Sequence, residues 1–133
     1  MKTMIRATCG LALTLLCTAP WAGVECTVEY GGARSLYHAE PTSQPYEVQP
    51  RDFGTYFQMR IVYRREPADL AGIRVYVYGT KGDVPVLIHQ GRWPLPGDGR
   101  RPVPGFTGLQ RVYEPLRGTE LEYQCDYSPE ARP

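Results

Sequence analysis

The chain has 133 residues, of which 42% are hydrophobic and 22% are charged, and its formal net charge is +1 at pH 7. This length suits one domain with a modest hydrophobic core. The nearly balanced charge provides no overall field that would draw the chain to nucleic acid or to an anionic membrane surface, so we expect no nucleic-acid partner.

The first 22 residues have the pattern of a cleaved secretory signal peptide. Lys2 and Arg6 precede an uncharged apolar run over residues 7–17, and a small residue at position 22 marks the expected cleavage point. The apolar run reaches only about half of the roughly 20 residues that a membrane-spanning helix needs, and Pro20 interrupts it. We therefore expect residues 1–22 to be removed, residues 23–133 to form a single domain, and no membrane span to remain.

The composition of the mature chain points to a bacterial envelope. Signal removal would take two of the fifteen basic side chains and leave thirteen against fourteen acidic ones, a net charge of −1 with both histidines neutral. Lys81 would be the single lysine beside twelve arginines, and the sequence has no asparagine. Such a bias is typical of a GC-rich genome, and the absence of asparagine excludes N-glycosylation sequons. We expect a periplasmic or secreted protein.

Apolar and polar residues alternate along several segments after residue 22, which is the pattern of half-buried β-strands. The strands predicted by this alternation are, in chain order, residues 24–30, 53–64, 73–78, 84–90 and 121–127, with weaker candidates at residues 36–38, 46–48 and 109–113. The glycines of residues 79–83 favour a short hairpin loop, and residues 66–72 have room for one helical turn.

These elements predict an all-β fold. No segment of ten or more residues has helical periodicity, and the chain contains fourteen glycines and thirteen prolines. We therefore predict a small antiparallel β-sandwich or open barrel of about seven or eight short strands.

Cys26 and Cys125 are the two cysteines of the mature chain, and we predict that they form a disulfide. Each lies on the apolar side of a terminal strand, so the bridge would tie the first strand to the last and close a loop of about 100 residues. Two unrelated buried thiols are the alternative. Metal binding by this pair alone is disfavoured, because structural zinc takes four ligands.

One face of the strand at residues 73–78 is a candidate binding surface. Its apolar side chains are predicted to face the core, and the opposite side carries Arg74, Tyr76 and Tyr78. Tyrosine and arginine often anchor interfaces, although tyrosine is also common on the wet face of a sheet. Three residues of the preceding strand could extend this surface: Tyr56, Arg60 and Arg64.

Residues 91–108 form a second candidate surface. The segment contains four prolines, which favour either a long loop or a projecting polyproline-like arm. It carries side chains suited to binding on a stiffened backbone: Trp93, Arg100, Arg101 and Phe106.

Catalytic and metal-binding patterns are weak. A blue-copper site would need a free cysteine thiolate beside the two histidines, His38 and His89, and both cysteines are predicted to be bridged. Carboxylates on the terminal strands would meet across the ladder if those strands pair, as glycosidase chemistry requires, but solvated strand faces give the same pattern. These carboxylates are Glu25, Glu29, Glu120 and Glu122. We assign no catalytic residue, no metal and no cofactor.

The leading hypothesis is a non-enzymatic exported interaction module that binds an envelope protein or glycan through the sheet face and residues 91–108. One alternative is a small envelope hydrolase that uses the strand carboxylates, for which loss of activity in Glu122→Gln would be diagnostic. Another is an inhibitor of a secreted hydrolase that acts through residues 91–108, which inhibition of a lysozyme or protease would favour.

Overall fold

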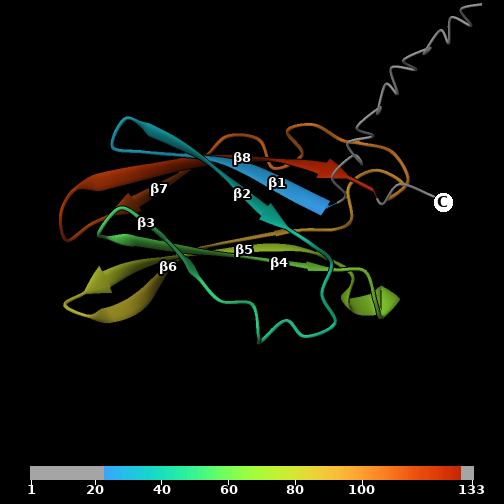
Figure 1. Cartoon of the computed structure of the whole chain (residues 1–133), viewed down its shortest axis with the longest axis horizontal. Coiled ribbons are helices and arrows are strands. Elements are labelled where there is room, and N and C mark those ends of the chain that lie inside the picture. Colours follow the sequence, from blue (N-terminus) through green and yellow to red (C-terminus); the bar gives the residue numbers. More distant parts are fainter. Residues whose placement is uncertain (1–22, 130–133) are drawn as a thin grey trace, which may run out of the picture.

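The computed structural model describes residues 23–129, so the predicted signal segment lies outside the described residues and stays a prediction. Residues 23–129 form eight β-strands and one short 3-10 helix. The strands make two four-stranded sheets in which neighbouring strands are antiparallel. Figure 1 shows the sheets stacked as two layers. The predicted all-β fold is confirmed, and of the two predicted architectures the sandwich is the one that forms.

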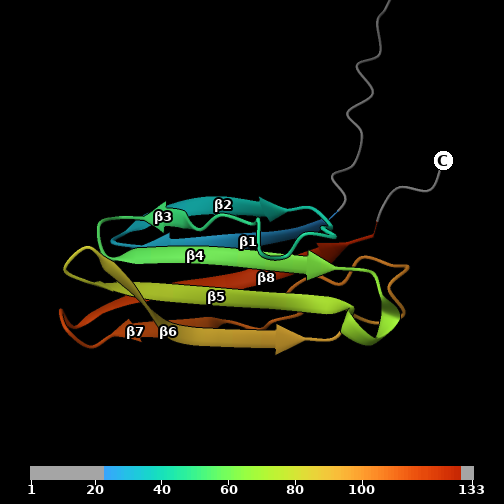
Figure 2. The ribbon, with the colours of Figure 1, turned by 90° about the horizontal axis from the view of Figure 1, so that it is seen from below.

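The first sheet has the strand order β2-β1-β8-β7, and the second has the order β3-β4-β5-β6. The strands of the first sheet are β1 (Gly23–Tyr30), β2 (Ala33–Ala39), β7 (Gln110–Glu114) and β8 (Thr119–Ser128). The strands of the second sheet are β3 (Arg51–Phe53), β4 (Phe57–Arg64), β5 (Gly72–Lys81) and β6 (Val84–Trp93). The 3-10 helix, η1 (Ala68–Leu70), forms the helical turn for which the sequence has room. In Figure 2 the second sheet faces the viewer, with β4, β5 and β6 side by side.

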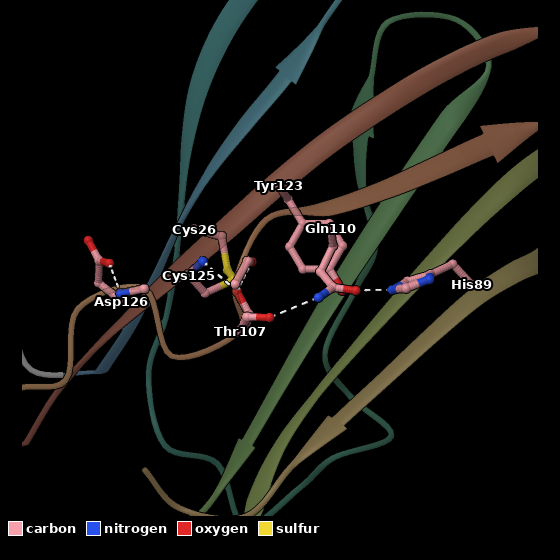
Figure 3. The surroundings of a disulfide bond; sticks show 9 residues. Cys26, His89, Thr107, Gln110, Tyr123, Cys125 and Asp126 are labelled. Carbon is pink, nitrogen blue, oxygen red and sulfur yellow. Dashed lines mark hydrogen bonds between the residues drawn. A yellow bond between two sulfur atoms is a disulfide. The ribbon is translucent and has the colours of Figure 1, made fainter. Parts of the chain in front are cut away.

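The predicted disulfide is present between Cys26 of β1 and Cys125 of β8. The two residues lie directly opposite each other in the β1–β8 ladder, and neither has any solvent exposure. Figure 3 shows the bridge on the inner side of this strand pair. The first and last strands are therefore neighbours at the centre of the first sheet, as their matched cysteines indicated.

The core lies between the sheets and is built by the inward faces that alternation predicts. Buried and more exposed positions alternate along β5, where Ile73, Val75 and Val77 are fully buried. Apolar side chains from both sheets complete one cluster, which includes Val24, Val28, Phe57, Met59, Ile61, Leu121 and Tyr123. Because one core spans both sheets, its burial is what holds the two layers together.

Two hydrogen bonds between side chains cross this core. Nε2 of His89 on β6 and the hydroxyl of Tyr123 on β8 are 2.7 Å apart, and the hydroxyls of Tyr63 on β4 and Tyr127 on β8 are 3.3 Å apart. Figure 3 shows His89 reaching toward Tyr123 from the opposite layer. Each bond satisfies polar groups that would be costly to bury alone.

The His89 contact predicts that acid destabilises the domain. Burial lowers the pKa of His89 below its usual value of 6.5, so below pH 6.5 the unfolded chain holds more protons on this residue than the folded chain does. The contribution of His89 to the free energy of unfolding should therefore fall as the pH drops through 6.5, and level off below the folded pKa. Urea unfolding at about pH 8 and about pH 5.5 measures this loss.

His89→Gln is the control, because glutamine keeps a partner for the Tyr123 hydroxyl and does not titrate. This variant should lose less stability than the wild type between the two pH values. An equal loss in both proteins would show that another group causes the acid sensitivity.

Residues 53–64 do not form one strand, which corrects the sequence prediction. Gly54 has a φ of 63°, and the chain reverses over residues 54–56 so that Phe53 of β3 pairs with Phe57 of β4. A glycine adopts this left-handed conformation at little cost. The three-residue turn leaves the side chains of Phe53 and Phe57 both pointing inward. In one continuous strand, two residues four positions apart would also point to the same side. Period-two alternation therefore gave no sign of the reversal.

Residues 46–48 are not a strand either. Residues 45–47 form a turn, and Tyr46 is 92% exposed. Pro41, Pro45 and Pro50 cannot donate to a ladder, which disfavours a strand in this segment. The candidate at residues 36–38 falls within β2, and the candidate at residues 109–113 overlaps β7 except for Leu109, so both strands are confirmed.

Residues 94–109 form a long loop that packs along β8, so the alternative of a projecting arm is wrong. The backbone of Val103 exchanges hydrogen bonds of 2.9 and 3.0 Å with Tyr127. The Thr107 hydroxyl accepts a 2.9 Å bond from the backbone N–H of Cys125. Apolar side chains of the loop pack against the core: Leu95, Val103 and Phe106. The loop stays on the domain because leaving it would expose these side chains.

Candidate binding face

The outer face of the second sheet brings the predicted binding residues of β5 together. Arg74 lies opposite Val62 of β4 and Arg92 of β6. Directly paired residues in a ladder point to the same side of the sheet, so these three side chains share its outer face. Tyr76 lies opposite Arg60 and Gln90. Tyr78 lies opposite Gln58 and Leu87. We call the surface formed by Arg60, Arg64, Arg74, Tyr76, Tyr78 and Arg92 the arginine–tyrosine face.

The predicted geometry of this face is correct for β5. Arg74, Tyr76 and Tyr78 are all partly exposed, and the three apolar residues that alternate with them are fully buried. Arg60 and Arg64 extend the face on β4 as predicted. Tyr56 does not join them, because it lies in the β3–β4 turn and packs against the core cluster, with the guanidinium of Arg117 4.1 Å from its ring centre.

The face carries a concentrated positive charge. Four arginines share this face. The acidic side chain that points to the same side from the neighbouring strand is Asp52 of β3, and its carboxylate accepts a 2.8 Å hydrogen bond from the Gln58 amide. None of the ion pairs within residues 23–129 involves one of these four arginines. Their charge is therefore not neutralised by a neighbouring carboxylate of the described chain.

The arginines also pack on the face. The guanidinium of Arg60 lies 4.6 Å from the ring centre of Tyr76, which is within cation–π range. Val62 is only 3% exposed although it points away from the core. Its neighbours on this side are Arg64 on its own strand and Arg74 across the ladder, and long arginine stems cover apolar surface in this way. The face is consequently polar over most of its surface, and Leu87, opposite Tyr78, is its exposed apolar residue.

Sequence reasoning missed Arg92. The β5–β6 register shifts between Val77 and Tyr78, so that Val77 pairs with His89 whereas Tyr78 pairs with Leu87. Ile88 is the extra residue of this bulge, and it changes which residues of β6 point outward. Alternation in β6 alone could not place Arg92 beside Arg74, because the shift becomes visible only when the two strands are paired.

The predicted residues of the 91–108 segment do not share one surface. Trp93 ends β6 opposite Ile73, is half-buried against the core, and meets the ring of Phe106 edge-on at 6.0 Å. Its ring also folds back over Gly91, where an added Cβ would lie only 2.1 Å from it. Trp93 is therefore a packing residue in this structure, which corrects its placement on an exposed loop.

Arg100 and Arg101 are exposed at the turn of the loop. The carboxylate of Asp98 accepts a 2.9 Å hydrogen bond from the backbone N–H of Arg100. That bond is the main reason why the pKa of Asp98 lies below its usual value. The loop leaves β6 immediately after Arg92 and Trp93, at the end of the second sheet where β4 ends and β5 begins (Figure 2).

The opposite side of the domain is acidic. Five carboxylates and two arginines point outward from the first sheet: Glu25, Glu29, Glu120, Glu122, Asp126, Arg34 and Arg111. Glu29 and Glu122 face each other across the β1–β8 ladder, and a hollow of about 290 Å³ lies beside them. The two outer faces of this nearly neutral chain therefore have opposite charge.

Two carboxylates of the hydrolase alternative, Glu29 and Glu122, meet across the ladder, and each has an arginine partner. Glu25 lies opposite Asp126, and Glu120 lies opposite Tyr113. Arg34 forms an ion pair with Glu29, and Nε of Arg111 lies 2.8 Å from Oε1 of Glu122. A glycosidase needs one carboxyl group that donates a proton to the leaving group, whereas Glu29 and Glu122 each accept a hydrogen bond from an arginine. This arrangement resembles a charged, solvated sheet face more than an acid–base pair.

The histidines do not come together. His38 points outward from the first sheet opposite Glu25, and His89 points into the core. Met59 is fully buried in the core cluster. Within the described part of the chain, no group of three or more histidine, cysteine or acidic side chains is placed to hold a metal ion.

Substitutions on the two sides of β5 should have separable effects. Val75→Ala is expected to lower the free energy of unfolding by about 1 to 3 kcal/mol, because it removes buried methyl groups and leaves a small cavity. Tyr76→Ala should cost less than about 1 kcal/mol, since the ring is partly exposed and its cation–π contact is weak. Thermal and urea unfolding test both values. If Tyr76→Ala unfolds the domain, the outer face of β5 is needed for folding and is not a surface free for binding.

Comparisons with protein-family models, with curated proteins and with solved structures find no match for this chain. Its function is therefore inferred from the residues of its own faces.

Proposed function

We propose that the mature chain is an exported, non-enzymatic interaction module that binds an anionic protein or glycan of the cell envelope through the arginine–tyrosine face. One observation carries the proposal. Four arginines without a carboxylate partner and two partly exposed tyrosines share one side of three adjacent strands.

The composition and rigidity of this face favour binding. Arginine and tyrosine are enriched among the residues that contribute most to interface affinity. The side chains project from paired strands that are fixed from below by fully buried residues such as Val75 and Val77. A surface that is already ordered loses little conformational entropy when a partner docks.

The disulfide supports the exported part of the proposal. A buried bridge between Cys26 and Cys125 fits an oxidising compartment outside the cytoplasm. Among residues 23–129, no helix has the length and apolar character to cross a membrane. The signal-like segment at residues 1–22 would supply the route of export.

Capture from envelope extract tests the proposal. Immobilised mature domain serves as bait, and protein and acidic sugar are both measured in the eluate. We expect Arg74→Gln and Tyr76→Ala each to reduce specific capture at least fivefold, because an interface anchor contributes 1 kcal/mol or more. Tyr113→Ala is the matched control, because Tyr113 is 58% exposed on the outer face of the first sheet.

Equal capture by all four proteins would refute binding through the arginine–tyrosine face. The hydrolase alternative makes a different prediction, namely turnover of peptidoglycan fragments that disappears in Glu122→Gln. The inhibitor alternative predicts inhibition of a lysozyme or protease that depends on Arg100 and Arg101, the exposed arginines of the 94–109 loop.

A further inference from the structure

The arginine–tyrosine face lacks the apolar centre of a typical protein interface. Protein interfaces usually have an apolar core surrounded by a polar rim. Here the central apolar residue, Val62, is 3% exposed and lies among arginines. Leu87 is exposed, but it lies opposite Tyr78, at the far end of the face from Arg74 and Arg92. A hydrophilic ligand therefore suits the face better than an apolar protein patch.

The positive charges extend over a surface larger than one small anion. Arg60 and Arg64 are four residues apart on β4, which corresponds to about 13 Å along the strand. Arg74 and Arg92 lie on the next two strands, and neighbouring strands are about 4.8 Å apart. A single phosphate or carboxylate would reach only one or two of these guanidinium groups. An extended polyanion would contact all of them.

The guanidinium groups retain hydrogen-bonding capacity. Nε of Arg60 and Nε of Arg64 have no hydrogen-bond partner among residues 23–129, but both atoms are buried, and Arg64 also donates a 3.5 Å bond to the carbonyl of Glu66. Arg74 is partly exposed and Arg92 is exposed, and neither guanidinium donates a side-chain hydrogen bond within the described residues. The fork of a guanidinium group matches the two oxygens of a carboxylate. An anionic ligand would thus meet unused donors on Arg74 and Arg92.

The tyrosines supply a second kind of contact. Tyr76 lies between Arg60 and Gln90 in the ladder, and Tyr78 lies two residues further along β5. An aromatic ring with a hydroxyl edge offers an apolar surface to the C–H groups of a sugar ring and a hydrogen bond to its hydroxyls. The two tyrosines therefore lie toward one end of the face, with Arg60 beside Tyr76, and the other three arginines lie toward the opposite end.

We infer that the ligand of the arginine–tyrosine face is an acidic polysaccharide, a carboxylate-bearing sugar polymer that lies across β4, β5 and β6. This inference rests on the proposed function and specifies its partner. The acidic outer face of the first sheet would repel the same polymer, so the domain would bind it with one side only.

Polygalacturonate is the probe, and neutral dextran is the control polymer. Binding is measured by affinity electrophoresis and by biolayer interferometry with the mature, disulfide-bonded domain. We expect the domain to bind polygalacturonate but not dextran, and salt to weaken binding between about 50 and about 200 mM because exposed charges are screened.

The double variant Arg74→Gln, Arg92→Gln should bind polygalacturonate at least tenfold more weakly. The double variant Arg34→Gln, Arg111→Gln removes the same charge from the opposite face and should change affinity less than twofold. Thermal unfolding of both variants checks that they fold. If Arg74→Gln, Arg92→Gln fails to fold, Arg92→Gln alone replaces it, because Arg92 is exposed on an edge strand, and a threefold loss is then expected.

Three results would overturn the inference. They are equal loss in both double variants, equal binding to dextran, and tighter binding to phosphatidylglycerol vesicles than to polygalacturonate, which would make a membrane surface the partner. If the domain ignores acidic polysaccharide but captures an envelope protein that is lost in Arg74→Gln, the glycan inference fails and the proposed function stands. If neither binding is found, both fail.

Discussion

Replacing Cys26 and Cys125 with alanine is expected to lower the free energy of unfolding by about 4 to 5 kcal/mol. The bridge joins residues 99 positions apart, so its loss frees almost the whole folded chain in the unfolded state. Small domains have total stabilities of about 5 to 15 kcal/mol, so the bridge contributes a large share. Urea unfolding of the wild type and the double variant measures the difference.

The wild type unfolded in the presence of a reductant is the control for this experiment. Intact mass should increase by two hydrogens on reduction, and the reduced protein should lose stability as the double variant does. A loss below about 1 kcal/mol in both would contradict the chain-entropy account. Such a small loss would mean either that β1 stays paired with β8 in the unfolded ensemble or that packing of the core supplies nearly all of the free energy of unfolding.

Glu114→Ala is expected to lower the free energy of unfolding by about 3 kcal/mol, because a buried charged acceptor is removed from two hydrogen bonds. The Glu114 carboxylate is 2% exposed at the end of β7 and accepts bonds of 3.0 and 2.9 Å from the backbone N–H groups of Leu116 and Arg117. It also lies 3.7 Å from the Arg117 guanidinium. Arg117 in turn donates a 2.7 Å bond to the carbonyl of Thr80 in the second sheet.

Glu120→Ala is the matched control for this residue, because Glu120 is an exposed glutamate of the same hairpin and should cost less than about 0.5 kcal/mol. The loss of unfolding free energy in Glu114→Gln should lie between those of Glu114→Ala and Glu120→Ala, because the glutamine amide keeps one oxygen acceptor but lacks the charge. If Glu114→Ala and Glu120→Ala cost the same, the carboxylate does not hold the β7–β8 hairpin against the second sheet.

The sequence determined the local character of most strands and the side of each that is buried. Alternation requires only the neighbours of a residue along the chain, and it correctly placed Val75 and Val77 inside and Tyr76 outside. It also placed Cys26 and Cys125 on inward faces. Together with the expected oxidising compartment and the presence of just two cysteines in the mature chain, this was enough to predict their bridge. The three adjacent outward residues of β5 in the candidate face were predictable for the same reason.

The tertiary structure decided everything that depends on which strand lies beside which. The chain reverses at Gly54, but Phe53 and Phe57 on either side of the turn both point inward. The alternation of apolar and polar residues therefore continues through the turn and could not separate β3 from β4. The bulge at Ile88 becomes visible only when β5 and β6 are paired, and it is this pairing that sets Arg92 beside Arg74.

The destination of the long loop and the charge of each outer face were also decided by packing. Prolines predicted that residues 91–108 would lie outside the ladder, whereas the loop begins only after Trp93 and spans residues 94–109. Phe106 and Val103 fix this loop on the domain through contacts distant in sequence. Individual acidic and basic residues are visible in the sequence. Their separation onto opposite faces follows from strand order, because β4, β5 and β6 contribute the arginines to one sheet while β1 and β8 contribute the carboxylates to the other.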